Sequence, residues 1–200
     1  AGLRLWVNYG SRGFVDRTPA TMAIDADTTI TSLLPVDWDR DIDVDLIVAT
    51  NQGVLLLENL RHGGFRQRGL IDSPEPVAAV EVVDADADAV WDLVTAGVAG
   101  IRLYRFGSSR GSQPAIIPVA ADACDGLTLL DYDNDCWLDL ACRTAAGLQL
   151  ARGLPGRFEA LSEPITAVAA TAVDCGDVDG DGDLDLVLAT PAGLDYLENN

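Results

Sequence analysis

Four aspartate-rich segments recur along the chain at a nearly constant spacing. Each has Asp at its first, third, fifth and ninth positions, and they begin at residues 37, 84, 131 and 177, which are 47, 47 and 46 residues apart. We name them the first to fourth Asp loops; they span residues 37–45, 84–92, 131–139 and 177–185. Repetition at one period of 46–47 residues predicts an array of similar structural units.

The segments between the Asp loops keep the same period. An apolar run follows each loop, and a glycine then opens an alternating run at Gly53, Gly100, Gly147 and Gly193, with a similar run at Gly2. Short runs of this kind bounded by Gly, Pro and Asx predict strands, and we find no apolar stripe of helical period. About four strands per period are typical of a β-propeller blade. We therefore predict a single all-β propeller domain over residues 1–200, with about four four-stranded blades, either complete or part of a larger ring.

The Asp loops are predicted to bind metal. Two unit charges 4 Å apart repel by about 1 kcal/mol in water and about 4 kcal/mol near a protein surface, so four carboxylates within nine residues need an offsetting charge. Calcium takes six to eight oxygen ligands, whereas transition metals prefer His or Cys. We expect up to four Ca²⁺ ions, held by Asp37, Asp39, Asp41, Asp45, Asp84, Asp86, Asp88, Asp92, Asp131, Asp133, Asp135, Asp139, Asp177, Asp179, Asp181 and Asp185.

Two other interpretations fit parts of the Asp pattern. Acidic runs are usually solvated turns, although four equivalent positions in four copies argue against that reading. An EF-hand loop shares the opening of the pattern but needs a bidentate Glu at position 12 and flanking helices. Position 12 is occupied here by Val48, Thr95, Cys142 and Leu188, so the EF-hand is excluded.

The repeat resembles the FG-GAP/VCBS-type repeats, which build the propeller heads of integrin α subunits and occur in relatives of cartilage acidic protein. The resemblance rests on the Asp pattern, on the strand that a glycine opens and on a later Asn-containing segment followed by Gly-Phe. This later segment occurs twice, at residues 57–59 followed by Gly64 and Phe65, and at residues 7–8 followed by Gly13 and Phe14. It spans nearly the whole chain. It implies that each Asp loop joins the first two strands of a blade and holds calcium.

The four loops differ at positions 4 and 6, where the family has glycine. Only the fourth loop has both glycines, Gly180 and Gly182, at positions where the turn favours residues that tolerate positive φ. The third loop has Asn and Cys there, the second two alanines, and the first Arg40 and Ile42. We predict that calcium affinity falls from the fourth loop to the third, second and first. Whether the first loop holds metal is left open, with Asp43 a backbone ligand or solvated rather than a side-chain ligand.

Charge and cysteine content bear on partners and location. The formal net charge is −19, and such an acidic chain repels nucleic acid and anionic membranes. No run approaches the roughly 18 apolar residues of a membrane span. Four cysteines allow three pairings, and they are either small buried strand residues or disulfide partners. Disulfides would agree with millimolar calcium in predicting an extracellular or cell-surface location, with the export signal outside this chain. The cysteines are Cys124, Cys136, Cys142 and Cys175.

The predicted function is structural assembly, adhesion or ligand binding, without catalysis. The chain has no nucleophile-elbow or P-loop motif and no Lys. We expect a protein or glycan ligand. If four blades close into a ring, the similar runs 2–8 and 193–199 compete for one place; either the chain is part of a larger propeller, or the spare strand pairs with another chain and builds homo-oligomers or filaments. The alternatives are a lectin-like glycan-binding module and a polysaccharide-active enzyme using carboxylates outside the loops, such as Asp25 and Asp27.

Overall fold

The computed structural model describes residues 2–107, 113–160 and 164–199. Within these ranges the regular structure is β-strand, apart from two single-turn 3₁₀ segments, η1 (Gly10–Arg12) and η2 (Ala20–Met22). The described residues form no helix long and apolar enough to cross a membrane. The all-β prediction is confirmed.

The chain divides into two compact units, Ala1–Val77 and Ala78–Asn200. The prediction of a single domain over residues 1–200 is not tested by this division and stays a prediction. The first unit contains a hairpin and one sheet, whose strands are β1 (Trp6–Asn8), β2 (Phe14–Asp16), β3 (Ile30–Val36), β4 (Asp45–Thr50), β5 (Gly53–Asn59) and β6 (Phe65–Asp72).

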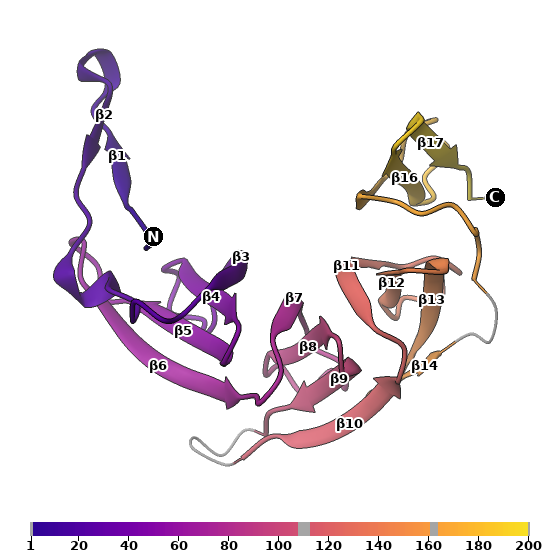
Figure 1. The fold of residues 1–200 in the computed structure, drawn as a ribbon, viewed down its shortest axis with the longest axis horizontal. Helices are drawn as coiled ribbons and strands as arrows, with labels where there is room; N and C mark the ends of the chain where they lie inside the picture. The colour runs from indigo at the N-terminus through magenta and orange to yellow at the C-terminus, as the bar shows by residue number, and fades with distance from the viewer. Residues whose placement is uncertain (1, 108–112, 161–163, 200) are drawn as a thin grey trace. The chain divides into compact units, whose positions relative to one another are not determined.

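The second unit contains three sheets (Figure 1). Its strands are β7 (Val77–Val83, which begins at the boundary), β8 (Asp92–Gly97), β9 (Gly100–Arg105), β10 (Ala115–Ala120), β11 (Cys124–Leu130), β12 (Asp139–Thr144), β13 (Gly147–Leu154), β14 (Arg157–Ala160), β15 (Ala172–Gly176), β16 (Asp185–Thr190) and β17 (Gly193–Leu197).

Each sheet is an antiparallel meander in which neighbouring strands follow one another in the chain. The orders are β3-β4-β5-β6, β10-β9-β8-β7, β11-β12-β13-β14 and β15-β16-β17. Three sheets therefore have the four strands predicted for a propeller blade, and the last has three strands within the described residues. The architecture is that of consecutive propeller-like blades.

The Asp loops connect the first and second strands of the four sheets, as the resemblance implies. They lie between β3 and β4, β7 and β8, β11 and β12, and β15 and β16. The apolar runs that follow the loops become these second strands. In β4, β8 and β12 nearly every residue is buried, because neighbouring strands cover both edges and packed side chains cover both faces.

The glycines that open the third strands permit a close backbone approach. Gly53 and Gly147 have φ values of 129° and 128°, which disfavour other residues. A Cβ at these two positions would lie 2.0 and 1.9 Å from the carbonyl oxygens of Ile71 and Thr166, respectively. A side chain there would therefore push away β6 in the first unit and the segment that follows β14 in the second.

Apolar residues from the middle strands form the core of each unit. In the first unit, Met22 covers a cluster that includes Val48 and Phe65. In the second unit, one cluster joins β8 and β9 to β11–β14, and another joins β12 and β13 to β16. Leu140 and Leu186 are fully or almost fully buried in these clusters. Packing of adjacent sheet faces therefore positions the Asp loops of the second unit.

Glu81 on β7 is a half-buried acid that interacts electrostatically with Asp174 on β15. Burial raises the pKa of Glu81 from its ordinary value of 4.5 to about 7, and the charge of Asp174 contributes in the same direction. The folded protein therefore binds a proton more tightly at this site than the unfolded chain. Ionisation of Glu81 makes the folded state progressively less stable as the pH rises from about 4.5 to 7.

We expect Glu81→Gln to raise the free energy of unfolding at pH 8 and to have little effect at pH 4.5. The reason is that the amide removes the buried charge that wild type carries only at the higher pH. Urea unfolding in EDTA at both pH values measures the effect, with exposed Glu159→Gln on β14 as the control. Equal effects of Glu81→Gln at the two pH values would contradict this prediction.

Candidate metal centre

In each Asp loop, three predicted ligand residues place one carboxylate oxygen each within 4.8 Å of the other two. These groups use positions 1, 3 and 5 in the first two loops and positions 1, 3 and 9 in the last two. They are Asp37, Asp39 and Asp41; Asp84, Asp86 and Asp88; Asp131, Asp133 and Asp139; and Asp177, Asp179 and Asp185. Oxygen donors gathered in this way suit a hard divalent cation.

All four loops share one backbone conformation at positions 4 and 6. The φ values there are positive in every loop, from Arg40 (60°) and Ile42 (80°) in the first loop to Gly180 (82°) and Gly182 (102°) in the fourth. The positive φ expected from the glycines of the fourth loop is thus also adopted by residues that disfavour it. Such a conformation costs an L-residue about 1–2 kcal/mol, so the first three loops carry strain that the fourth avoids.

The loops are also organised by their own side chains. In the third loop, the Asp131 carboxylate accepts hydrogen bonds from the backbone N–H groups of Asp135 (3.1 Å) and Cys136 (2.9 Å). Asp135 in turn accepts the N–H of Trp137 at 2.9 Å. The first and second loops repeat this arrangement. Carboxylates at positions 1 and 5 are therefore held in place by the turn itself.

The carboxylate at position 9 has a structural role that the sequence did not reveal. It is 0–3% exposed in all four loops. One oxygen accepts the N–H of position 2 at 2.8–3.2 Å, and the other accepts an N–H at the end of the third strand at 2.6–2.9 Å. These residues are Asp45, Asp92, Asp139 and Asp185. Each binds its Asp loop to the third strand of the same sheet.

A further residue beside each loop was missed by sequence analysis. Positions are counted from the first Asp of each loop. The backbone N–H of position 23, at the end of the third strand, donates to the position-9 carboxylate, so the residue before it, position 22, lies next to the loop. Position 22 is Glu58, Arg105, Arg152 and Glu198 in the four copies. Arg152 Nε lies 2.8 Å from Asp133 Oδ2, and its Nη2 lies 3.0 Å from Asp135 Oδ2. Arg105 forms an ion pair with Asp86. The constant spacing between the first Asp of each loop and this residue was the signal in the sequence that could have identified position 22.

The charge at position 22 influences the carboxylates of the loop. Burial raises the pKa of Asp39, and the charges of Asp41 and Glu58 raise it further. The pKa of Asp179 is also raised: the Asp181 N–H lowers it, but desolvation and nearby carboxylates, including Glu198, outweigh that bond. In the third loop, the Trp137 N–H and then Arg152 lower the pKa of Asp135 against the effect of burial.

Two local features bear on other expectations from the sequence. Asp43, at position 7 of the first loop, forms an ion pair with Arg61, whose Nη2 also donates to the Asp41 carbonyl oxygen at 3.1 Å.

All four cysteines are free thiols; Cys124 and Cys142 are buried on the paired strands β11 and β12. Disulfides therefore provide no support for the predicted extracellular location.

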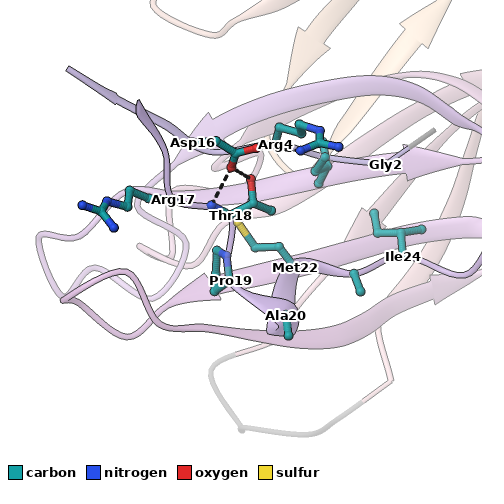
Figure 2. A pocket seen from close by; sticks show the side chains of 11 residues that line it. Gly2, Arg4, Asp16, Arg17, Thr18, Pro19, Ala20, Met22 and Ile24 are labelled. Atoms are coloured by element: carbon teal, nitrogen blue, oxygen red, sulfur yellow. Dashed lines mark hydrogen bonds and ion pairs between the residues drawn. The ribbon is translucent and has the colours of Figure 1, made fainter. Parts of the chain in front are cut away.

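An open pocket of about 810 Å³ lies in the first unit, beside the β1–β2 hairpin and η2. Asp16 forms its polar wall: it accepts the Thr18 N–H and hydroxyl at 2.9 and 2.6 Å and pairs with Arg4 at 2.6 Å. Figure 2 shows Arg17 extending away from this group. No aromatic residue lines the pocket, and the exposed Asp25 and Asp27 lie outside its lining.

The repeated sheets and their Asp loops define a β-propeller-type repeat protein. Residues 131–188, from the third Asp loop into β16, match the model of the FG-GAP-like repeat, which supports membership of an FG-GAP-type repeat family. The relation to integrin-like members stays an expectation.

The fold is similar to the solved structure of a lectin from Agrocybe aegerita. That lectin is described as specifically recognising non-reducing terminal N-acetylglucosamine. The TM-score is 0.69 at 19% identity, and the match covers 100% of this chain and 58% of the lectin chain. This chain therefore spans less than two thirds of the lectin's length. Comparison with curated proteins gave no significant match.

We predict that Ile42→Gly stabilises the protein, because glycine relieves the strain of a β-branched residue at φ 80°. The gain is limited to about 1 kcal/mol by the greater entropy of glycine in the unfolded chain. Urea unfolding in EDTA measures the change. Val44→Gly is the matched control: Val44 is exposed, β-branched and in the same loop, but lacks a positive φ. A similar loss of stability in both variants would overturn the prediction.

Asp139→Ala is expected to destabilise the protein by about 3 kcal/mol in EDTA, because two backbone N–H groups lose their buried acceptor. Asp133→Ala in the same loop should cost no more than about 1 kcal/mol, since it removes a partly exposed ion pair with Arg152. Chemical denaturation of both variants without metal provides the comparison. Equal costs would mean that position 9 has no special structural role.

Proposed function

We propose that this chain is a calcium-stabilised, non-catalytic β-propeller binding module that works outside the cell. The observation that carries the proposal is the group of three carboxylates in each of four equivalent loops, with oxygens within 4.8 Å. Extracellular calcium is abundant enough for sites of modest affinity. The match of residues 131–188 to the FG-GAP-like repeat gives independent support.

The carboxylates at positions 1, 3, 5 and 9 would hold the ion. Bound calcium would supply positive charge that offsets repulsion among these groups, and four ions would change the formal charge from −19 to −11 (−19 + 8). The fourth loop suits this role best, because glycine at positions 4 and 6 adopts the required backbone without strain. Calcium would then stabilise the blades rather than take part in a reaction.

A second candidate function is glycan binding. It is favoured by the likeness of the fold to the Agrocybe aegerita lectin, which is described as recognising non-reducing terminal N-acetylglucosamine. The open pocket in the first unit offers polar groups from Arg4 and Asp16 but no aromatic stacking surface. We therefore keep ligand binding in general as the main proposal, with glycans as one class of ligand and proteins as the other.

Homo-oligomer or filament formation by strand exchange belongs to the same proposal. Large apolar side chains are exposed on β17, with Leu194 77% and Tyr196 42% exposed. The β1–β2 hairpin exposes Trp6 and Phe14 to 55% and 65%. Strand addition covers such surfaces and pairs backbone groups along sheet edges. Sedimentation in calcium tests this: a monodisperse monomer at high concentration would rule it out.

We expect millimolar calcium to raise the melting temperature and EDTA to lower it. A site with a Kd one hundredfold below the free calcium concentration adds about 2.7 kcal/mol to stability. Thermal melts in calcium, in EDTA and in magnesium at equal ionic strength measure the effect. Magnesium is the control because it prefers a tighter octahedral shell with retained water. An unchanged melt in calcium would mean that the Asp loops are solvated turns.

If the module binds glycans, a glycan array probed in calcium should retain it on a definite class of terminal sugar. The lectin likeness makes N-acetylglucosamine-terminated glycans the first class to test. The same array probed with the free sugar as competitor is the control for specificity. Absence of binding to any glycan in calcium would remove the lectin-like candidate and leave protein ligands.

A further inference from the structure

We propose that Arg105 and Arg152 are built-in cations that take the place of a divalent ion in the second and third Asp loops and direct metal binding to the fourth. The inference rests on the calcium binding proposed above, and it concerns only the three loops of the second unit. It identifies position 22, a residue outside the Asp loops, as the determinant of which loop accepts a metal ion.

The placement of position 22 follows from hydrogen bonds shared by the three copies. The backbone N–H of the next residue, Phe106, Gly153 or Asn199, donates to the position-9 carboxylate at 2.8, 2.6 and 2.9 Å. This bond fixes the end of the third strand against the loop. Whatever side chain occupies position 22 therefore starts from the same place relative to the carboxylates.

In the third loop, Arg152 contacts two of the predicted ligands. Its Nε and Nη2 lie 2.8 and 3.0 Å from oxygens of Asp133 and Asp135. Guanidinium groups suit such paired contacts with carboxylates. A metal ion at this loop would have to compete for the same oxygens and would be repelled by the nearby positive charge.

In the second loop, Arg105 pairs with Asp86 and is confined by the neighbouring sheet. Gly156, in the turn between β13 and β14, donates its N–H to the Ala85 carbonyl oxygen at 2.7 Å. A Cβ on Gly156 would lie only 2.9 Å from Arg105 Nη1. One side of the partly exposed guanidinium is thus packed against the adjacent turn, which favours its staying on the loop.

The fourth loop has the opposite charge at the same place. Position 22 is Glu198, and among the described residues no arginine forms an ion pair with Asp177, Asp179, Asp181 or Asp185. Counting positions 1, 3, 5, 9 and 22, the formal charge is −5 in the fourth loop (−4 − 1) and −3 in the third (−4 + 1). The fourth loop is thus more negative than the third by two charges, which favours binding of a divalent cation in the fourth loop.

Calcium titration by calorimetry, with the number of bound ions as the readout, tests the proposal. We expect Arg152→Glu to bind one more ion than wild type, because it gives the third loop the residue of the fourth. Glu198→Arg should weaken the tightest site on the order of a hundredfold. Exposed Arg157→Glu on β14 makes the same charge change as Arg152→Glu and should leave the number of ions unchanged.

The outcomes separate this inference from the proposed function. Wild type that binds no calcium would overturn both. Wild type that binds more than two ions, so that the second or third loop must be occupied, or Arg152→Glu that binds no additional ion while folded by circular dichroism, would overturn the role of position 22 alone. Because Arg105 is packed against Gly156, Arg105→Glu risks misfolding, so the decisive pair is Arg152→Glu and Glu198→Arg.

Discussion

The buried carboxylate at position 9 is the interaction on which each Asp loop depends. It receives one N–H from the start of its loop and one from the end of the third strand, which are distant in sequence. A buried carboxylate without such donors would be costly, and two buried N–H groups without an acceptor would be costly as well. The loop, the second strand and the third strand are therefore positioned together, whether or not an ion is present.

This anchoring explains how the same loop conformation is kept by different sequences. Positive φ at positions 4 and 6 suits Gly180 and Gly182 but strains Arg40 and Ile42. The strain is tolerated because carboxylates at positions 1, 5 and 9 bond to the loop backbone and fix its path. Local residue preference modulates the stability of each loop, while the hydrogen-bond network decides its shape.

With the shape fixed, the loops differ chiefly in charge. Arginine beside the second and third loops and glutamate beside the fourth place opposite charges next to similar carboxylate groups. A repeat array can in this way use some copies as structural turns whose charge an arginine partly offsets, and others as cation sites. Within the second unit, this would concentrate any calcium dependence in the fourth loop rather than spread it over all three blades.

The sequence alone determined the repeat, the strands and the place of the Asp loops, because these follow from local patterns of apolar residues, glycine and aspartate. It also predicted positive φ at positions 4 and 6 from the glycines of the fourth loop. Only the tertiary structure decided that position 9 is an anchor, that Arg105 and Arg152 lie on the loops, and that Cys124 and Cys142 are buried on adjacent strands as free thiols. These contacts join residues 14 to 19 positions apart, and they depend on strand register and on packing between sheets, which no local pattern specifies.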